Sequence, residues 1–261
     1  MITIKRLMLC ALMAPVAILS SSFSAKSQSV PKGVKNVVLV HGAFADGSSW
    51  SNVIPLLQAR GFNVTAVQNP LTSLDDDVAA TRRAIALMDG PVLLVGHSWA
   101  GMVITVAGND PKVAGLMYVS ALIPNEGQSV VDVNQPYPAG PGSAEFRADS
   151  SGFLSLSPKG IHEDFAQDLP AAKRNVLFAT QTPWAAPATT QKVYGVAWKT
   201  KPSWCIIATN DRMINPALER AEAKMINATA IELTSSHVPM ISQPDKVVAF
   251  IAEATQKLSA R

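Results

Sequence analysis

Cysteine, charge and aromatic side chains are all scarce in this chain of 261 residues. It has two cysteines, 16% charged residues and 6% aromatic residues, against 48% hydrophobic residues. This hydrophobic fraction excludes a disordered chain and suits one packed domain. One cysteine, Cys10, lies in a segment that we expect to be removed. Cys205 then has no partner for an intrachain disulfide, and we expect it to be a buried core thiol.

The chain also lacks an apolar run long enough to cross a bilayer, which takes about 20 residues. Its apolar run near the start, Leu7–Leu19, follows the basic pair Lys5-Arg6 and precedes a stretch of small residues. A basic region, a short apolar core and a small-residue exit are typical of a secretory signal peptide. We therefore expect cleavage of residues 1–27, a mature chain of residues 28–261 with no stable membrane span, and export to the periplasm or the extracellular medium.

Neither sign of charge is in excess once that segment is removed. The whole chain has 22 Lys and Arg against 19 Asp and Glu, and residues 1–27 include Lys5, Arg6 and Lys26 but no acidic residue. The expected mature chain therefore has as many basic as acidic residues. Without a basic excess or a basic patch, nucleic acid is not an expected partner.

From residue 34 onward, strand-like and helix-like segments alternate. The expected strands are Val37–Val40, Phe62–Val67, Pro91–Gly96, Leu116–Ser120, Trp204–Ala208 and Ala228–Leu233, and the expected helices are residues 48–60, Thr72–Met88, Trp99–Ala107, Pro216–Met225 and Pro244–Leu258. This order predicts an α/β fold with a mostly parallel sheet flanked by helices. Residues 124–200, with many prolines and weak periodicity, predict a lid or cap insertion over the carboxyl edge of the sheet. Acidic residues 75–77 are expected to stabilise the start of their helix.

The strongest chemical motif is Gly96-His97-Ser98-Trp99-Ala100-Gly101, between an expected strand and an expected helix. A serine at such a sharp turn presents its Oγ to a cavity, and the crowded turn requires small flanking residues. Gly96, Ala100 and Gly101 meet that requirement. We therefore expect Ser98 to be a nucleophile.

Two backbone amides are candidates for an oxyanion hole. The N–H of Trp99 follows the serine at the start of a helix, and the N–H of Phe44 belongs to the loop His41-Gly42-Ala43-Phe44 after the first long strand. We expect His41 itself to bond within this loop, because a general base that follows the serine in sequence is the usual arrangement.

The general base and its acid are expected from loops after the last two strands. Of the four histidines, His237 follows the last strand, whereas His97 adjoins the serine and His162 lies in the insertion. Asp211 follows the strand Trp204–Ala208 and is the expected partner of His237. Asp132, after the strand Leu116–Ser120, is the alternative acid. Asp245 falls in the final helix and is poorly placed.

These motifs resemble the α/β-hydrolase superfamily, in which nucleophile, acid and histidine follow the chain order of Ser98, Asp211 and His237. The run His41–Trp50, HGAFADGSSW, together with Gly96-His97-Ser98, is similar to the group of plant methylesterases, hydroxynitrile lyases and bacterial carboxylesterases such as pyrethroid hydrolases. The lyases of that group have threonine in place of Gly42 and lysine in place of Val238. The resemblance therefore implies a serine carboxylic-ester hydrolase that forms an acyl-enzyme on Ser98.

We expect an apolar pocket beside Ser98 for a small-molecule ester, with neither metal nor other cofactor. The candidate pocket residues are Phe44, Trp99, Met102 and Trp184, with Phe153, Phe165, Tyr194 and Trp198 as further candidates. Two alternatives stay open at this stage. One is a lyase or cofactor-free perhydrolase that uses the same site, and the other is a non-catalytic protein of this fold that binds a small ligand.

Overall fold

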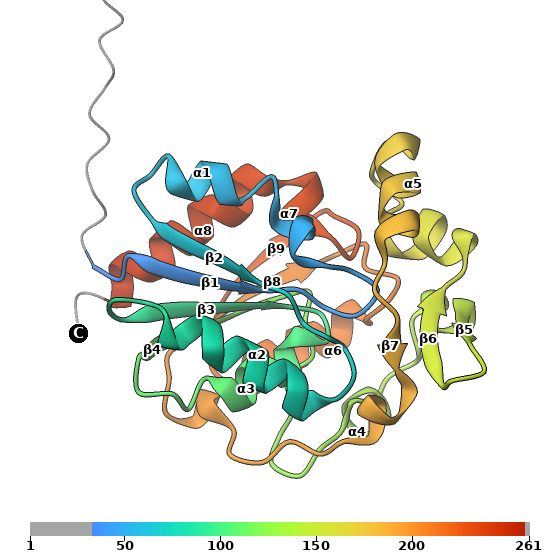
Figure 1. Ribbon diagram of the computed structural model, residues 1–261, viewed down its shortest axis with the longest axis horizontal. Coiled ribbons are helices and arrows are strands. Elements are labelled where there is room, and N and C mark those ends of the chain that lie inside the picture. Colours follow the sequence, from blue (N-terminus) through green and yellow to red (C-terminus); the bar gives the residue numbers. More distant parts are fainter. Residues whose placement is uncertain (1–32, 259–261) are drawn as a thin grey trace, which may run out of the picture.

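The structure is a computed structural model that describes residues 33–258. The expected signal peptide, residues 1–27, lies outside the described residues. Within the described part, no helix is both long and apolar enough to cross a membrane. Figure 1 shows one sheet with helices on both sides and a separate group of small elements at one end.

The main sheet has six strands, all parallel, in the order β2-β1-β3-β4-β8-β9. The strands are β1 (Asn36–Val40), β2 (Asn63–Val67), β3 (Val92–His97), β4 (Val113–Val119), β8 (Ser203–Ala208) and β9 (Thr229–Leu233). Every residue of the central strands β1 and β3 is buried. Continuous apolar runs of this kind are typical of strands covered on both faces. The predicted mostly parallel α/β sheet is therefore confirmed.

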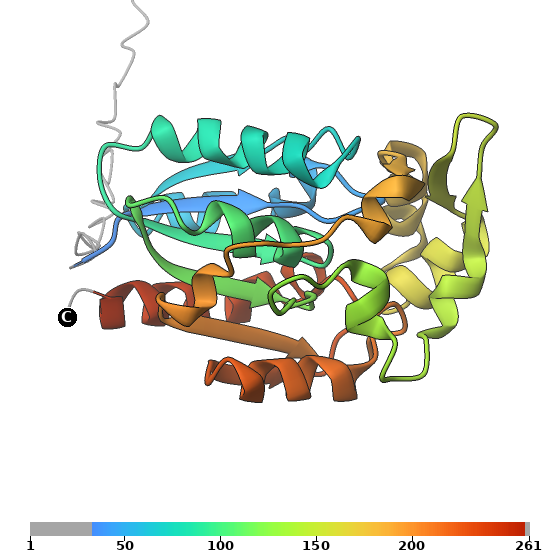
Figure 2. The same cartoon turned by 90° about the horizontal axis from the view of Figure 1, so that it is seen from below.

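Helices cover both faces of this sheet (Figures 1 and 2). One face carries α1 (Ile54–Gln58) and α8 (Pro244–Leu258), and the other carries α2 (Leu74–Ala86), α3 (Ala100–Ala107) and α6 (Pro216–Met225). The expected helix over residues 48–60 is wrong in detail. A 3-10 turn, η1 (Gly47–Trp50), comes first, and α1 starts after it, where Pro55 occupies the first turn.

The segment between β4 and β8 forms a separate layer at the carboxyl ends of the strands (Figure 1). We call residues 124–200 the cap segment. Its elements are α4 (Val130–Asn134), η2 (Pro141–Glu145), β5 (Phe146–Ala148), β6 (Phe153–Leu156), η3 (Gly160–Phe165), α5 (Ala171–Thr180), β7 (Trp184–Ala185), η4 (Ala186–Thr190) and η5 (Ala197–Lys199). The strands β5, β6 and β7 pair antiparallel in a small second sheet. The start of β1 and the end of α8 lie at the opposite end of the molecule.

Within residues 33–258, the core supports this arrangement without a disulfide. Cys205, on β8, is a free and buried thiol, as predicted, and burial raises its pKa well above the ordinary value. The register pairs Val40 with Gly96 and Ala208 with Leu233, so these strands end close to one level of the sheet. The loops that follow these strands meet at the edge beneath the cap segment. The last loop, after β9, leads into the short helix α7 (Pro239–Ser242). The loops at this edge hold the candidate site.

Candidate active site

Ser98 lies on the sharp turn between β3 and α3, with a left-handed backbone of φ 56°. The turn is as crowded as the sequence predicted. A Cβ on Gly96 would lie 2.8 Å from the carbonyl oxygen of Ala100, and one on Gly101 would overlap the carbonyl oxygen of Leu122. A non-glycine residue at positive φ is under backbone strain, which is common where a side chain must be presented to a site. The hydroxyl is thereby held at the carboxyl edge of the sheet.

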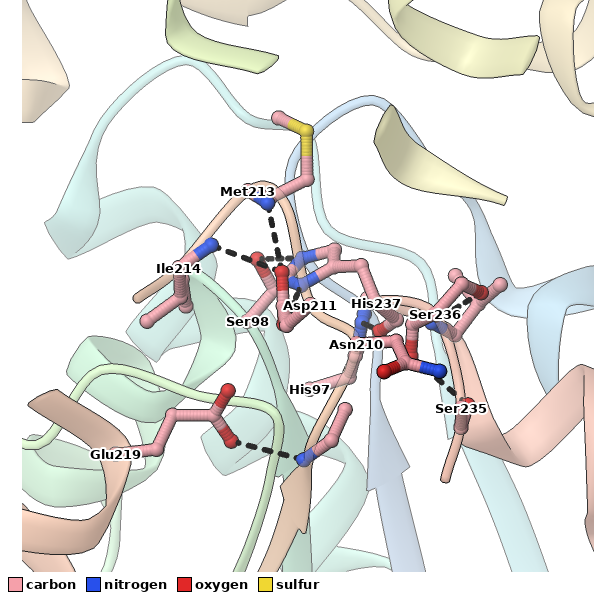
Figure 3. A network of polar contacts seen from close by, with 12 residues as sticks. His97, Ser98, Asn210, Asp211, Met213, Ile214, Glu219, Ser235, Ser236 and His237 are labelled. Carbon is pink, nitrogen blue, oxygen red and sulfur yellow. Dashed lines mark hydrogen bonds and ion pairs between the residues drawn. The ribbon is translucent and has the colours of Figure 1, made fainter. Parts of the chain in front are cut away.

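A chain of two hydrogen bonds joins Ser98, His237 and Asp211 (Figure 3). The Oγ of Ser98 lies 2.8 Å from Nε2 of His237, and Nδ1 of the same ring lies 2.5 Å from Oδ2 of Asp211. The imidazole and the carboxylate are buried, with side-chain exposures of 1% and 0%. The structure thus brings together three residues that are far apart in the sequence. Such a chain can move a proton from the hydroxyl to the imidazole.

Asp211 is fixed from several directions. Its Oδ1 accepts hydrogen bonds from the backbone N–H groups of Met213, at 2.7 Å, and Ile214, at 2.9 Å. Behind it, Glu219 on α6 is fully buried, and burial, with the nearby charge of Asp211, raises the pKa of Glu219 well above its usual value. Burial and the charge of Asp211 therefore both favour the neutral form of Glu219 beside Asp211.

The alternative acid has a different position. Asp132 lies in the first turn of α4, where it forms a capping box with Ser129. The structure therefore pairs His237 with Asp211 and leaves Asp132 as a helix cap.

His97, which precedes the serine, lies beneath His237. Its Nε2 is 2.8 Å from the carbonyl oxygen of His237, and the two ring centroids are 4.7 Å apart. Because a carbonyl only accepts, Nε2 of His97 must carry the proton. Complete burial holds the pKa of His97 well below its usual value, so the ring is neutral. The side chain bonds to the backbone of the loop that carries His237 and makes no hydrogen bond to the Ser98 hydroxyl.

The two candidate oxyanion donors also meet at this edge. Phe44 and Trp99 both line the cavity next to Ser98, and within residues 33–258 neither backbone N–H has a hydrogen-bond acceptor. The Phe44 backbone is left-handed, with φ 59°. Gly42 allows the close approach of this loop, since a Cβ there would lie 2.7 Å from Cβ of Ser98. His41 bonds within its own loop, as expected, with its Nδ1 donating to the carbonyl of Gly42 at 2.9 Å. Its Nε2 accepts from the backbone N–H of Asn69, which follows β2.

A cavity of about 370 Å³ opens in front of Ser98 and His237. Its other lining residues come from the loops of the main sheet and from the cap segment, and they are Ala43, Phe44, Trp99, Leu122, Val130, Val131, Asn134, Ala139, Gly140, Ser143, Phe146, Leu154, Phe165, Trp184, Thr189, Met213 and Ile214. None of these side chains is ionisable. The lining is therefore mostly apolar, and among the described residues His237 is its one ionisable group.

The structure separates the pocket residues proposed from the sequence. Phe44, Trp99, Trp184 and Phe165 line the cavity. The prediction for Met102 is wrong, because its side chain packs in the core on α3 with no exposed surface. Three of the further candidates, Phe153, Tyr194 and Trp198, do not line the cavity. Tyr194 is 65% exposed, and Nε1 of Trp198 donates to the carbonyl of Pro124.

Several residues that serve the site gave no signal in the sequence. Cap residues bond to both loops that carry the polar side chains: Asp168 accepts from the backbone N–H of Ser236 at 2.9 Å, and Gln167 donates to the carbonyl of Asn210 at 2.7 Å. Arg212 also pairs with the buried Asp164 at 2.7 Å. These contacts join distant segments, so no local pattern could reveal them. His162 is partly exposed and does not line the cavity.

The interpretation of the three acidic residues in α2 is partly wrong. The helix is capped by Ser73, which bonds to Asp76, as expected for a helix start. Asp77 instead turns inward and is fully buried, where its Oδ2 accepts from Nε1 of Trp99 at 2.7 Å. Asp77 therefore contacts a cavity residue, Trp99, in addition to lying at the start of the helix. No three His, Cys, Asp or Glu side chains group as metal ligands anywhere in residues 33–258.

Comparison with known proteins agrees with this architecture. The chain is 28% identical over 251 residues to a pyrethroid hydrolase of Sphingobium wenxiniae, with 84% of this chain and 87% of the relative covered. It is 27% identical to salicylic acid-binding protein 2 of Nicotiana tabacum, covering 85% and 98%. The fold superposes on the crystal structure of polyneuridine aldehyde esterase with a TM-score of 0.73 at 20% identity, covering 84% and 98%. The resemblance predicted from the motifs is confirmed. A family model described as the alpha/beta hydrolase family matches residues 37–250, and the chain belongs to that family.

Proposed function

We propose that the protein hydrolyses small, uncharged, apolar carboxylic esters through an acyl-enzyme on Ser98. The observation that carries this proposal is the hydrogen-bond chain from Asp211 through His237 to Ser98 at the floor of an apolar cavity. Hydrolase and esterase names among the relatives support the same class of reaction. A cavity without charged side chains favours a neutral substrate, because a buried charge without a partner is costly.

The proposed reaction has two acyl-transfer steps. Nε2 of His237 takes the proton of the Ser98 hydroxyl as Oγ attacks the ester carbonyl. The oxyanion of the tetrahedral intermediate is stabilised by the N–H groups of Phe44 and Trp99. When the intermediate collapses, His237 gives its proton to the leaving alcohol. A water molecule, deprotonated by His237, then attacks the acyl-enzyme. As the acyl–Oγ bond breaks and the acid leaves, His237 returns this proton to Oγ of Ser98.

Two features favour ester hydrolysis over a cyanohydrin lyase. Gly42 offers no hydroxyl, and a Cβ there would collide with Ser98. Val238 is completely buried and apolar, where the similar lyases have a lysine. Neither residue can hold a cyanohydrin hydroxyl or a cyanide ion, so we do not propose a lyase.

A panel of p-nitrophenyl esters of increasing acyl length, with a fluorophosphonate probe, tests the proposal. We expect the wild-type protein to cleave esters and to be labelled at Ser98. We expect Ser98→Ala to lose both labelling and at least about 10⁴-fold of the turnover. A wild-type protein that binds apolar esters without cleavage or labelling would instead be a ligand-binding protein, and full activity of Ser98→Ala would rule out Ser98 as the nucleophile.

We also propose that residues 1–27 are a signal peptide and that the mature protein is exported. The basic pair and the apolar run Leu7–Leu19 support this. Expression of the full chain with fractionation and N-terminal sequencing tests it. A mature protein that begins near residue 28 in the exported fraction is expected, whereas an intact N-terminus in the cytosol would contradict it.

A further inference from the structure

Asp77 is a buried carboxylate that the proposed reaction does not use. It lies in the first turn of α2, has no exposed surface and accepts two hydrogen bonds. Its Oδ2 accepts from Nε1 of Trp99 at 2.7 Å, and its Oδ1 accepts from the backbone N–H of Leu71 at 2.8 Å. Both partners are donors only, so the ionised carboxylate satisfies both. Burial raises the pKa of Asp77 to about 6.

The bond to Leu71 connects Asp77 to the cap segment. Leu71 has a left-handed backbone with φ 57°, and its carbonyl accepts a hydrogen bond from the N–H of Ala185 at 2.9 Å. Ala185 belongs to β7, the short strand that also carries Trp184. Asp77 thus holds the strained residue on which the cap strand rests.

The bond to Trp99 connects Asp77 to the cavity. The rings of Trp99 and Trp184 lie against each other, with centroids 5.0 Å apart, and both line the cavity. The ring of Phe44 meets that of Trp184 edge-on at 6.0 Å. We call Trp99 and Trp184 the tryptophan wall. The carboxylate of Asp77 therefore bonds directly to Trp99. Through Leu71 it also supports β7, the strand that carries Trp184.

We propose that Asp77 is a positioning residue that sets the substrate range, because it holds the tryptophan wall in place for esters that carry an aromatic ring. This inference rests on the proposed function and adds to it the class of substrate. Aromatic rings stack favourably on one another at centroid distances of about 4.5–7 Å. A ring of the substrate would gain that contact only when the indole of Trp99 is fixed. A small aliphatic ester gains little from it.

Two esters separate this role from a general loss of structure. Ethyl acetate has no ring, and benzyl phenylacetate has one ring on each side of the carbonyl, so either orientation brings a ring to the wall. We expect Asp77→Asn to lower kcat/KM for benzyl phenylacetate by about 10-fold or more, with a raised KM, because the amide N–H₂ faces one of the two donors. We expect ethyl acetate to change by less than about 3-fold.

Two companion variants make this experiment decisive. Trp99→Phe keeps a ring and removes the Nε1 donor, so it should shift the ratio of the two esters in the same direction, and the double variant should not add to it. Asp75→Asn removes the same charge from the exposed face of the same helix turn and should leave the ratio unchanged. Equal losses on both esters, or no loss on either, would overturn the inference.

Binding measurements keep the inference separate from the proposed reaction. In the Ser98→Ala background, we expect Asp77→Asn to raise the dissociation constant for benzyl phenylacetate, measured by calorimetry, by about 10-fold. An unchanged dissociation constant would overturn the positioning role whether or not the protein cleaves esters. A wild-type protein that cleaves neither ester but shows this weaker binding would contradict the proposed function alone.

Discussion

Nε2 of His97 donates a hydrogen bond to the carbonyl oxygen of His237 across 2.8 Å, so the residue before the serine holds the loop of the imidazole that faces it. His97 is fully buried and neutral. The distance between Ser98 and His237 therefore depends on a side chain that touches neither the hydroxyl nor the cavity.

Replacement of His97 tests this dependence. We expect His97→Leu to lower kcat by about 10- to 100-fold with little change in KM, because the loop of His237 loses its anchor and the imidazole moves. His97→Gln retains an N–H donor and should keep most of the activity. His162→Leu, at a partly exposed position in the cap segment, is the control. An equal kcat for the Leu and wild-type proteins would contradict the anchor role.

The choice between the two candidate acids can be tested directly. We expect Asp211→Asn to lower kcat by about 10³- to 10⁴-fold, because an amide neither fixes the imidazole tautomer nor stabilises the imidazolium. Asp132→Asn removes only a helix cap and should change activity little. Steady-state kinetics on one p-nitrophenyl ester suffice. A larger loss of kcat in Asp132→Asn than in Asp211→Asn would instead identify Asp132, on α4, as the acid that acts with His237.

Gly42 sets the distance between the first loop and the turn at Ser98. A Cβ at this position would lie 2.7 Å from Cβ of Ser98 and 2.8 Å from the carbonyl oxygen of His97. We expect Gly42→Ala to lower kcat by about 100-fold or more, since the loop must shift and take the Phe44 N–H with it. Gly90→Ala, where a Cβ makes only ordinary contact, is the control and should be fully active.

The pKa of Asp77, about 6, predicts that substrate preference depends on pH. Below that pH, the protonated carboxyl turns an O–H toward one of its two donors, Trp99 Nε1 and the Leu71 N–H. The negative charge of the neighbouring, exposed Asp76 also raises the pKa of Asp77. We expect the preference for benzyl phenylacetate over ethyl acetate to fall as pH drops from 7 to 5.

The ratio of the two kcat/KM values is the measurement for this prediction, because any effect of pH on the chemical step that the two esters share cancels in the ratio. In Asp77→Asn the ratio should be low and flat over the same range. A wild-type ratio that stays constant from pH 7 to 5 would show that the ionisation of Asp77 has no part in substrate preference.

Glu222, buried on α6, predicts how stability depends on pH. Its Oε1 accepts from the N–H of Ile123 at 2.9 Å, and burial raises its pKa well above the ordinary 4.5. Above pH 4.5 the unfolded chain gives up this proton while the folded chain keeps it. The free energy of unfolding therefore falls with pH, by about 1.4 kcal/mol per unit for this group, until the folded pKa is passed.

Urea unfolding between pH 5 and 9 measures this slope. We expect Glu222→Gln to keep the bond to Ile123 and to lose this group's share of the slope, so that its advantage over the wild type grows with pH. Glu163→Gln, on the exposed surface of the cap segment, is the control. Parallel curves for the wild type and Glu222→Gln would contradict a raised pKa at this site.

The sequence predicted best what depends on strand ends. In a parallel sheet, loops after successive strands meet at one edge, so Ser98, Asp211 and His237 could be placed together from their positions after β3, β8 and β9. The sequence was less informative inside helices. Nearly every residue of α3 is apolar and buried, so periodicity could not tell that Met102 faces the core instead of the cavity.

The rest depends on contacts between distant segments. Asp77 looks like its two acidic neighbours in the sequence, and its buried bond to Trp99, 22 residues away, leaves no local pattern that would set it apart. The cap strands β5, β6 and β7 have between two and four residues, too few for an alternating pattern to be visible. Their pairing joins segments up to about 40 residues apart, such as Ala148 in β5 and Trp184 in β7 on either side of Leu154 in β6.

The first described residues and the end of α8 lie at the end of the molecule away from the cap segment. A solid support coupled near either of these positions would therefore leave the mouth of the cavity facing the solution. Coupling through lysines of the cap segment, such as exposed Lys173 on α5, would instead place the support against the segment that lines the cavity. The fold thus favours attachment by its ends for a filter or sensor that must admit apolar molecules freely.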